Sequence, residues 1–183
     1  MTLSTNGIAS DVTGKRILIT GGASGIGAAS ALLLASRGAK VVIGDLAEAL
    51  GAVVAKQGQE AGHSIVFKKV DVTSGDEVRA LFAFAMQELG GLDVVINNAG
   101  IDHQPAPMHE LSDDDFDRNI AVNLKGVWHC MRAAVACMAT NGGGHVINVA
   151  SIAGLRSAPL LSAYSAAKHG VMGLTKSAAH EYA

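Results

Sequence analysis

The chain has 183 residues, 49% of them hydrophobic and 16% charged, which suits one globular domain with a sizeable core and argues against disorder. Its formal charge is -2 and only 4% of its residues are aromatic, so we expect no nucleic-acid-binding surface. No apolar run is as long as a membrane span, and the polar start MTLSTNGIASDVTG lacks the basic and apolar parts of a signal peptide. These exclusions favour a cytoplasmic protein with no membrane partner.

Short apolar segments alternate with helical patterns along the whole chain. Five strands are expected, at residues 16–20, 40–45, 64–70, 94–97 and 145–149. Helices are expected at residues 25–37, 47–61, 74–89 and 113–140, and a last helix begins near Ser162. The strands are nearly all apolar rather than alternating, which is typical of parallel strands covered on both faces. We therefore predict one α/β domain over residues 1–183, a Rossmann-type doubly wound parallel sheet of five strands in the order 3-2-1-4-5 with helices on both faces.

The first strand runs into a glycine-rich loop, TGGASGIG at residues 20–27, which precedes the first helix. In a dinucleotide-binding loop, Gly21 would permit the tight turn, Gly25 would let the backbone approach a pyrophosphate, and Gly27 would let the helix pack against the strand. The start of the helix then offers free N–H groups and a partial positive charge to phosphate. Taken alone, the same glycines could form a purely structural turn.

A carboxylate stands at the end of the second strand, where Asp45 lies 18 residues past Gly27. In that place it can accept hydrogen bonds from both ribose hydroxyls of adenosine, and it would repel a 2′-phosphate. Neither the position of Ser24 nor the position after Asp45 carries a Lys or Arg that would welcome such a phosphate. The pattern predicts NAD rather than NADP, although Asp45 could also be the N-cap of the following helix.

Tyr164 and Lys168 lie four residues apart in the last helix, so their side chains share one face. A free tyrosine has a pKa of about 10, and a nearby ammonium favours the phenolate. Tyr164 could then take a proton from an alcohol, or give one to a ketone, near neutral pH. Without other motifs, the pair would simply be a surface aromatic ring beside a lysine.

Together these motifs resemble those of the short-chain dehydrogenase/reductase family, over about residues 12–183. The motifs that carry the resemblance are TGGASGIG at 20–27, Asp71-Val72, Asn97-Asn98-Ala99-Gly100, Asn123, Ser151 and Tyr164-x-x-x-Lys168. The resemblance implies that NAD is held by Gly21, Ser24, Gly25, Ile26, Gly27, Asp45, Leu46, Asp71, Val72, Asn98, Ala99, Gly100, Tyr164 and Lys168. It also implies that Asp71 bonds the adenine amino group, with Val72 nearby, and that the turn at 98–100 lines a ribose and stabilises the sheet.

The resemblance further implies four catalytic residues, Asn123, Ser151, Tyr164 and Lys168. Tyr164 would be the general acid and base, Ser151 would hold the substrate oxygen, and Lys168 would favour the phenolate and hold the nicotinamide ribose. Asn123 would position a water that links Lys168 to solvent. The implied function is an NAD-dependent oxidoreductase that transfers a hydride between NAD(H) and a small-molecule secondary alcohol or ketone. The alternatives left open are an NAD-binding sensor or scaffold without turnover, and a dehydration or epimerisation on the same fold.

A run of aspartates at 113, 115 and 117 might suggest a calcium loop, but it does not fit one. Arg118 and Leu124 stand where the loop needs glycine and glutamate. Ser112 is instead predicted to cap a helix whose first turn is acidic. We expect no metal site.

The last helix is rich in small residues, and by resemblance it would pair, with the long helix before it, against the same helices of a second copy. A homodimer, or a homotetramer built from two such dimers, is therefore expected. Cys130 and Cys137 are seven residues apart in a helical pattern, too far to bridge, so free thiols are expected. The substrate is not identified, although residues 101–110 and 152–161 would line its site.

The resemblance also implies a longer chain than the one given. Family members usually continue past the position of Ala183 with a further strand, a loop over the nicotinamide and a substrate lid. We therefore expect that a C-terminal third is missing from this sequence, and that the outer edge of the fifth strand lies open.

Overall fold

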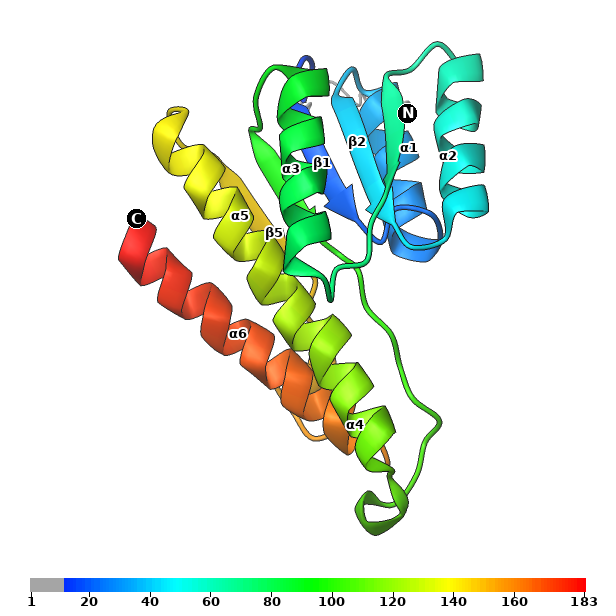
Figure 1. Ribbon diagram of the computed structural model, residues 1–183, viewed down its shortest axis with the longest axis vertical. Coiled ribbons are helices and arrows are strands. Elements are labelled where there is room, and N and C mark those ends of the chain that lie inside the picture. The colour runs from blue at the N-terminus through cyan, green and yellow to red at the C-terminus, as the bar shows by residue number, and fades with distance from the viewer. Residues whose placement is uncertain (1–11) are drawn as a thin grey trace, which may run out of the picture.

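The computed structural model describes residues 12–183, so the predicted absence of a signal peptide falls largely on residues 1–11, outside the described part. The five strands are β1 (Arg16–Thr20), β2 (Lys40–Asp45), β3 (Ile65–Lys69), β4 (Val94–Asn97) and β5 (His145–Asn148). All of them pair in parallel, in the order β3-β2-β1-β4-β5 (Figure 1). The predicted doubly wound sheet and its strand order are confirmed.

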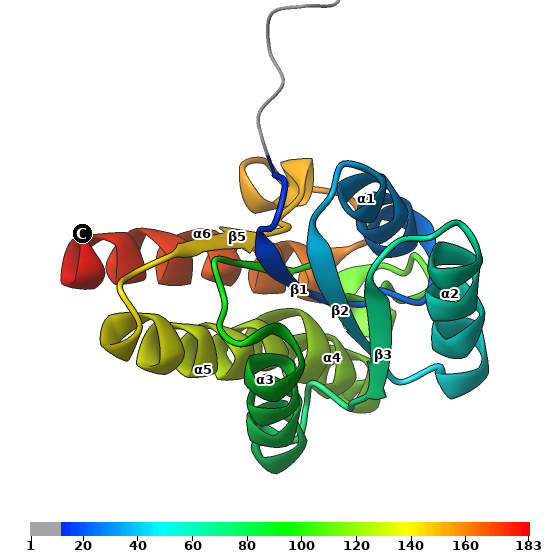
Figure 2. The same ribbon diagram turned by 90° about the horizontal axis from the view of Figure 1, so that it is seen from above.

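Helices cover both faces of the sheet, as predicted. They are α1 (Gly25–Ser36), α2 (Glu48–Glu60), α3 (Gly75–Leu89), α4 (Asp113–Ile120), α5 (Val127–Thr140) and α6 (Ser162–Tyr182). α1 and α2 pack on one face, and α3 and α5 on the other (Figure 2). Successive strand side chains point to opposite faces, so Ile17 and Ile19 join the core under α1 and α2, while Leu18 joins the core under α3 and α5.

The prediction of one regular helix over residues 113–140 is wrong in its middle. α4 passes into a π-helical segment, Ala121–Gly126, before α5 begins. That segment contains Asn123, a fully buried side chain whose amide bonds to the backbone of Ile101 in another part of the chain. Such widened turns occur frequently at functional sites. The periodicity of the sequence could not indicate it, because the hydrogen-bond partner lies 22 residues away.

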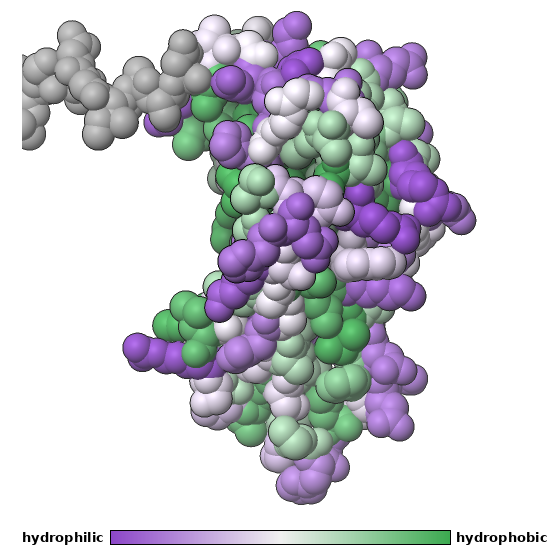
Figure 3. Space-filling view, turned by 90° about the vertical axis from the view of Figure 1, so that its left-hand side faces the viewer, coloured by the Kyte–Doolittle hydropathy of each residue, from purple (hydrophilic) through white to green (hydrophobic). Residues whose placement is uncertain are grey.

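α6 lies beside α5 beyond β5 and closes the core at that end of the sheet. Val171 is fully buried there and packs with Val127 and Met131 of α5. Among the described strands β5 pairs only with β4, and Ile147 is 49% exposed, so the outer edge of β5 is open as expected. Figure 3 shows this side of the molecule, where apolar surface in green lies between polar groups.

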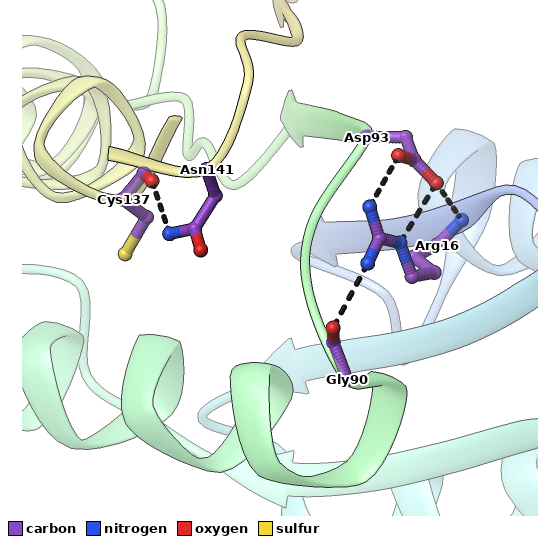
Figure 4. A network of polar contacts seen from close by, with 5 residues as sticks. All are labelled: Arg16, Gly90, Asp93, Cys137 and Asn141. Atoms are coloured by element: carbon purple, nitrogen blue, oxygen red, sulfur yellow. Dashed lines mark hydrogen bonds and ion pairs between the residues drawn. The ribbon is translucent and has the colours of Figure 1, made fainter. Parts of the chain in front are cut away.

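An ion pair ties the amino ends of β1 and β4 together (Figure 4). The Arg16 guanidinium donates from Nη2 to Asp93 Oδ1 at 2.7 Å and from Nε to Oδ2 at 3.0 Å, and its Nη1 donates to the Gly90 backbone oxygen at 2.9 Å. These hydrogen bonds lower the pKa of Asp93 to about 2. The opposite, carboxyl edge of the sheet carries the motifs.

Two smaller predictions are also confirmed. Ser112 caps α4, because its Oγ accepts a hydrogen bond from the Asp115 amide at 3.1 Å. Cys130 and Cys137 are free thiols, and burial raises the pKa of Cys130 to about 12.

Within residues 12–183, no helix has both the length and the apolar character needed to cross a membrane.

Candidate active site

A cleft of about 380 Å³ opens at the carboxyl edge of the sheet, where the loops after β1, β2, β3 and β4 meet. Its lining residues are Gly21, Ser24, Gly25, Ile26, Asp45, Leu46, Val70, Asp71, Val72, Asn98, Ala99, Gly100, Ile101 and Val122. Most of the predicted cofactor residues therefore come together in one place. Val70 and Val122 were not predicted, although each is the direct neighbour of a predicted residue, and Ile101 was predicted for the substrate site rather than for the cofactor.

The glycine loop leaves room at the floor of this cleft. Gly21 has a φ of +68°, and a Cβ there would lie 2.7 Å from Ala99 Cα, so the turn needs glycine. A Cβ on Gly27 would collide with the Gly21 backbone oxygen, so α1 packs directly against the loop. Gly25 instead has a φ of +52° and open space where a Cβ would stand. That space lies at the start of α1, where a phosphate group would fit.

The start of α1 differs from the starts of two other helices. Ser24, its N-cap residue, makes no side-chain capping bond, and its first turn contains no acidic residue. Ser74 caps α3, and Ser112 caps α4, each with acidic residues in the first turn. The first N–H groups of α1 are therefore turned toward the cleft without a competing side chain, which suits a negatively charged pyrophosphate.

Asn98 joins the loops that follow β1 and β4. Its Nδ2 donates to the backbone oxygens of Thr20 and Gly21 at 3.1 and 2.9 Å. The Thr20 hydroxyl in turn accepts from the amides of Asn98 and Ala99 at 3.2 and 3.3 Å. These bonds hold the two loops at a fixed separation across the cleft.

Asp45 is held by backbone amides at the rim of the cleft. Its Oδ2 accepts from the Ala23 amide at 3.0 Å, and its Oδ1 accepts from the Ala47 amide at 2.9 Å. The alternative that Asp45 is the N-cap of the next helix is wrong, because Ala47 occupies the cap position of α2. Each carboxylate oxygen keeps a second lone pair that can accept from a ribose hydroxyl.

Asp71 is placed by the turn that leads into α3. Its Oδ1 accepts from the amide and the hydroxyl of Thr73 at 2.9 and 2.8 Å. Its own amide donates to Glu77 Oε2 at 2.9 Å, which fixes the backbone at this corner. The other carboxylate oxygen of Asp71 stays available on the wall of the cleft.

Lys168 and Tyr164, from the first two turns of α6, do not line this cleft. Lys168 is only 3% exposed, and its Nζ donates to the Val149 backbone oxygen at 2.9 Å. The same ammonium lies 5.5 Å from the centre of the half-buried Tyr164 ring. Burial lowers the pKa of Lys168 because it disfavours the charged form.

Asn123 lies close to Lys168 across Gly100. A Cβ on Gly100 would stand 2.8 Å from Asn123 Oδ1 and 3.6 Å from Lys168 Nζ. The Asn123 amide is already bonded, since Nδ2 donates to Ile101 O at 2.8 Å and to Asn119 Oδ1 at 2.7 Å, and Oδ1 accepts from the Ile101 amide at 3.0 Å. Asn123 therefore anchors the chain that leaves β4, and any water it helps to position would use a remaining lone pair.

Ser151 follows β5 and begins a short 3-10 turn, Ile152–Gly154. Its Oγ accepts from the Ala153 amide at 3.2 Å, which leaves the O–H able to donate to another oxygen. The loop after Ser151 meets the loop after β4 where the Ala106 amide donates to Leu160 O at 3.0 Å. The two segments that were expected to line the substrate site thus meet at Ala106 and Leu160.

Within residues 12–183, no group of three His, Cys, Asp or Glu side chains is placed to hold a metal ion.

Residues 15–183 match the family model described as short chain dehydrogenase. The chain is 48% identical over 166 residues to a cis-4-hydroxycyclohexanecarboxylate dehydrogenase from Sinomonas cyclohexanicum, covering 91% of this chain and 66% of that protein. It is 44% identical over 169 residues to a 3beta-hydroxysteroid dehydrogenase from Mediterraneibacter gnavus, covering 92% of this chain and 61% of that protein. The chain thus spans about two thirds of the length of these relatives.

The fold is also similar to solved structures. A short chain dehydrogenase/reductase from Burkholderia phymatum, solved in complex with NAD, superposes with a TM-score of 0.89 at 34% sequence identity. That likeness covers 93% of this chain and 61% of the other.

Proposed function

The chain belongs to the short-chain dehydrogenase family, and on this premise we propose that the protein is an NAD-dependent oxidoreductase that interconverts a secondary alcohol and a ketone. The observation that carries the proposal is the buried Lys168 ammonium, 5.5 Å from the Tyr164 ring, on a helix that packs at Lys168 against the short turn after Ser151. Tyr164, as the proton acceptor, and Ser151, as the hydroxyl donor, would then act on the same substrate oxygen, next to the cleft that suits a dinucleotide.

The chemistry divides between the cofactor and the side chains. When bound, the nicotinamide cofactor accepts the hydride in oxidation and supplies it in reduction. Tyr164 takes the proton of the substrate hydroxyl on its phenolate oxygen, and returns it in the reverse direction. Lys168 favours that phenolate by its positive charge, and Ser151 donates its O–H to the substrate oxygen to hold it in place.

Asn123 and Lys168 complete the route of the proton. The proton that reaches Tyr164 passes by way of Lys168 to a water positioned by Asn123, and from there to solvent. Asn123 Oδ1 and Lys168 Nζ both lie near the place that a Cβ on Gly100 would take, at 2.8 and 3.6 Å, and this closeness supports the route. Because Asn123 also holds the backbone of Ile101, it keeps the chain after β4 from closing over the lysine.

The cofactor proposed is NAD rather than NADP. The Asp45 carboxylate stands at the rim of the cleft, held by the amides of Ala23 and Ala47. None of the residues that line the cleft is basic, so a 2′-phosphate would meet a negative charge with no compensation. The NAD-bound relative from Burkholderia phymatum supports the same choice.

The substrate class proposed is a secondary alcohol carried on a six-membered carbon ring. Both relatives described above are named for such ring alcohols, one a hydroxycyclohexane and the other a hydroxysteroid. The loop after Ser151 exposes Ile152, Leu155 and Leu160, at 71%, 68% and 50% respectively. Apolar side chains of this kind would cover the hydrocarbon part of a ring while Ser151 holds its oxygen.

The assembly proposed is a homodimer through α5 and α6, or a homotetramer formed from two such dimers. A groove of about 480 Å³ runs between these helices on their outer side, lined by Trp128, Leu174 and Tyr182 among others. Trp128 is 40% exposed and Tyr182 is 61% exposed. Large apolar groups of this kind are common at protein interfaces.

The test is a panel of alcohols with the full chain and either NAD or NADP. We expect NADH to form with cyclohexanol and cis-4-hydroxycyclohexanecarboxylate, and NADPH to form more slowly. An NAD-binding sensor would bind the cofactor but oxidise none of the alcohols. An epimerase or dehydratase would change the substrate without net NADH formation, and either result would contradict the proposal.

A further inference from the structure

A chain of side-chain hydrogen bonds runs from the sheet to α6, outside the cleft. Asn97 of β4 donates from Nδ2 to Oδ1 of Asn148 in β5 at 2.8 Å. Asn148 donates from its own Nδ2 to Thr175 Oγ1 of α6 at 2.9 Å. Thr175 then donates to the Val171 backbone oxygen at 2.7 Å. The chemistry proposed above uses none of these side chains.

This series of hydrogen bonds gives α6 a second attachment to the end of β5. The first is the bond from Lys168 Nζ to the Val149 backbone oxygen, and the second joins Thr175 to the preceding residue, Asn148. Lys168 and Thr175 are seven residues apart, which is two turns and about 10 Å along a helix. Two attachments this far apart fix both the position and the direction of α6 relative to β5, whereas one fixes a single point.

Packing alone would set the position of α6 along its axis only weakly. Apart from Lys168, its buried residues are Ala163, Ala167 and Val171, none larger than valine. Side chains of this size interdigitate less deeply with a neighbouring element than large ones do. Directed hydrogen bonds from β5 supply the missing constraint, because they are lost when the helix shifts by about 1 Å.

The hydrogen bonds from Asn97 through Asn148 to Thr175 contribute little to the free energy of unfolding. Asn97 is only 1% exposed, and its Oδ1 is buried without a hydrogen-bond partner among residues 12–183. Burial of an unpartnered polar atom is unfavourable, and apolar side chains would fill the same space at lower cost. What the polar chain provides, and apolar packing does not, is an exact distance between β5 and α6.

We propose that Asn148 and Thr175 are positioning residues, which set the place of α6 along β5 so that Tyr164 and Lys168 meet a substrate held at Ser151. The proposal rests on the proposed function. Thr175 is 11 residues from Tyr164, about 16 Å along the helix, so it acts through α6 and touches no reacting atom.

The test is Thr175→Val in the full chain, which keeps the shape of the side chain but leaves Asn148 Nδ2 without its oxygen partner. Activity is measured with NAD and cyclohexanol, and nucleotide binding is measured with AMP. AMP reports on the cleft of β1, β2 and β3, which the Asn148–Thr175 bond does not touch. Thr175→Ser restores a hydroxyl at the same place. Thr140→Val is the matched control, because Thr140 also bonds within its helix, to Ala136 O and Cys137 O, but on an exposed surface.

We expect Thr175→Val to lower kcat about 10- to 100-fold, as for a misplaced reacting group, with AMP affinity unchanged. The pH profile of kcat/KM should shift to higher pH, because Lys168 no longer sits as closely beside Tyr164. Thr175→Ser should recover most of the rate, and Thr140→Val should behave as the original protein does.

Two results would overturn the proposal. One is a Thr175→Val variant that is less stable but keeps its kcat and pH profile, since the bond would then serve the fold alone. The other is an equal loss of AMP binding and activity, which would mean that the whole domain is disturbed. If the original protein itself oxidises no alcohol, the proposed function fails first, and the AMP data show whether the protein is folded.

Discussion

The two halves of the sheet hold their functional groups by different means. Beside β1, β2 and β3 the cleft is shaped by backbone, through the glycine turns, the uncapped start of α1 and an Asp45 carboxylate fixed by two amides. Beside β4 and β5, Asn123 and Lys168 are placed by side-chain bonds to segments that lie 22 and 19 residues away. Cofactor binding and reaction should therefore fail separately when one half is altered.

The largest effect on cofactor binding is expected from Gly27→Ala, which disturbs the cleft beside β1, β2 and β3. The new Cβ would collide with the Gly21 backbone oxygen and approach Asn98 Nδ2 to 2.6 Å. α1 must move away from the loop, so NAD affinity should fall about 100-fold and unfolding should become easier by about 1–3 kcal/mol. Titration of NAD by calorimetry and chemical denaturation measure the two effects.

Gly173→Ala is the control for that substitution. Gly173 is also helical, but no atom lies within 4 Å of the place its Cβ would take. The Gly173→Ala variant should have a free energy of unfolding about 0.5–1 kcal/mol higher, because alanine has a higher helix propensity than glycine. If Gly27→Ala instead binds NAD as well as Gly173→Ala does, the close approach of α1 is not needed for the cofactor.

A smaller effect in the same half is expected from Asp45→Asn. The amide keeps an oxygen for only one of the two backbone contacts, places an NH₂ group against the other N–H and removes the charge. NAD should therefore bind about tenfold more weakly and NADP more tightly. Dissociation constants for both cofactors, measured on the same sample, give the change in preference. An unchanged preference for NAD would place the specificity at some residue other than Asp45.

Asp93→Asn tests the join between the halves, because Arg16 and Asp93 connect β1 to β4 away from both sites. The pKa of Asp93 is lowered to about 2, chiefly by its hydrogen bond to Arg16. The charged carboxylate stabilises the fold above its ordinary pKa, and that stabilisation is lost as the pH falls from about 4 toward 2. The substitution should cost about 1–3 kcal/mol near neutral pH.

Denaturation curves at several pH values measure this effect. The difference in the free energy of unfolding between Asp93→Asn and the original protein should shrink as the pH falls from about 4 toward 2. NAD affinity should be unchanged at neutral pH. A difference that stays constant with pH would show that the ion pair is not its cause.

The smallest effect is expected at His129, a buried residue of α5 packed against Gly75 of α3. Burial, and the charges of Arg132, Lys125 and Arg79, lower its pKa, so the folded protein resists its protonation. Stability should therefore fall as the pH drops below about 6.5, where the unfolded chain takes up the proton.

His129→Gln should remove that part of the pH dependence, by about 1 kcal/mol or less between pH values of about 7 and 5. The exposed His145→Gln is the control. Thermal unfolding across this range is the measurement, and equal slopes for His129→Gln and the original protein would exclude His129 as the source.

The half of the site beside β1, β2 and β3, which the backbone shapes, was the more predictable from sequence. The motif TGGASGIG, Asp45 and Asp71 are local signals, because a short run of residues encodes both the turn and the chemistry. Asp45, Asp71 and four residues of the motif line one cleft, namely Gly21, Ser24, Gly25 and Ile26. Only Val70 and Val122 of that lining were not predicted for any part of the site. Apart from the helix expected over residues 113–140, strand and helix bounds differed from expectation by at most one residue at each end, since these ends depend on weak capping contacts.

The half of the site beside β4 and β5, which side-chain hydrogen bonds hold in place, was predicted less completely. Tyr164 and Lys168 were found by their spacing, but the π-helical segment around Asn123 depends on a bond to Ile101 that no local pattern contains. Two signals for the Asn148–Thr175 hydrogen bond were present in the sequence. Asn148 is a polar residue that directly follows the apolar Val146 and Ile147 in β5. Thr175 also stands two helical turns after Lys168, on the same face.

The most direct measurement compares Tyr164→Phe with the original protein for NAD affinity and for the rate of NADH formation from cyclohexanol. The ring of phenylalanine keeps the packing but has no oxygen to take the proton. We expect NAD affinity within about twofold of the original and a rate about 10²- to 10⁴-fold lower. A variant that binds NAD and keeps its rate would contradict Tyr164 as the acid and base.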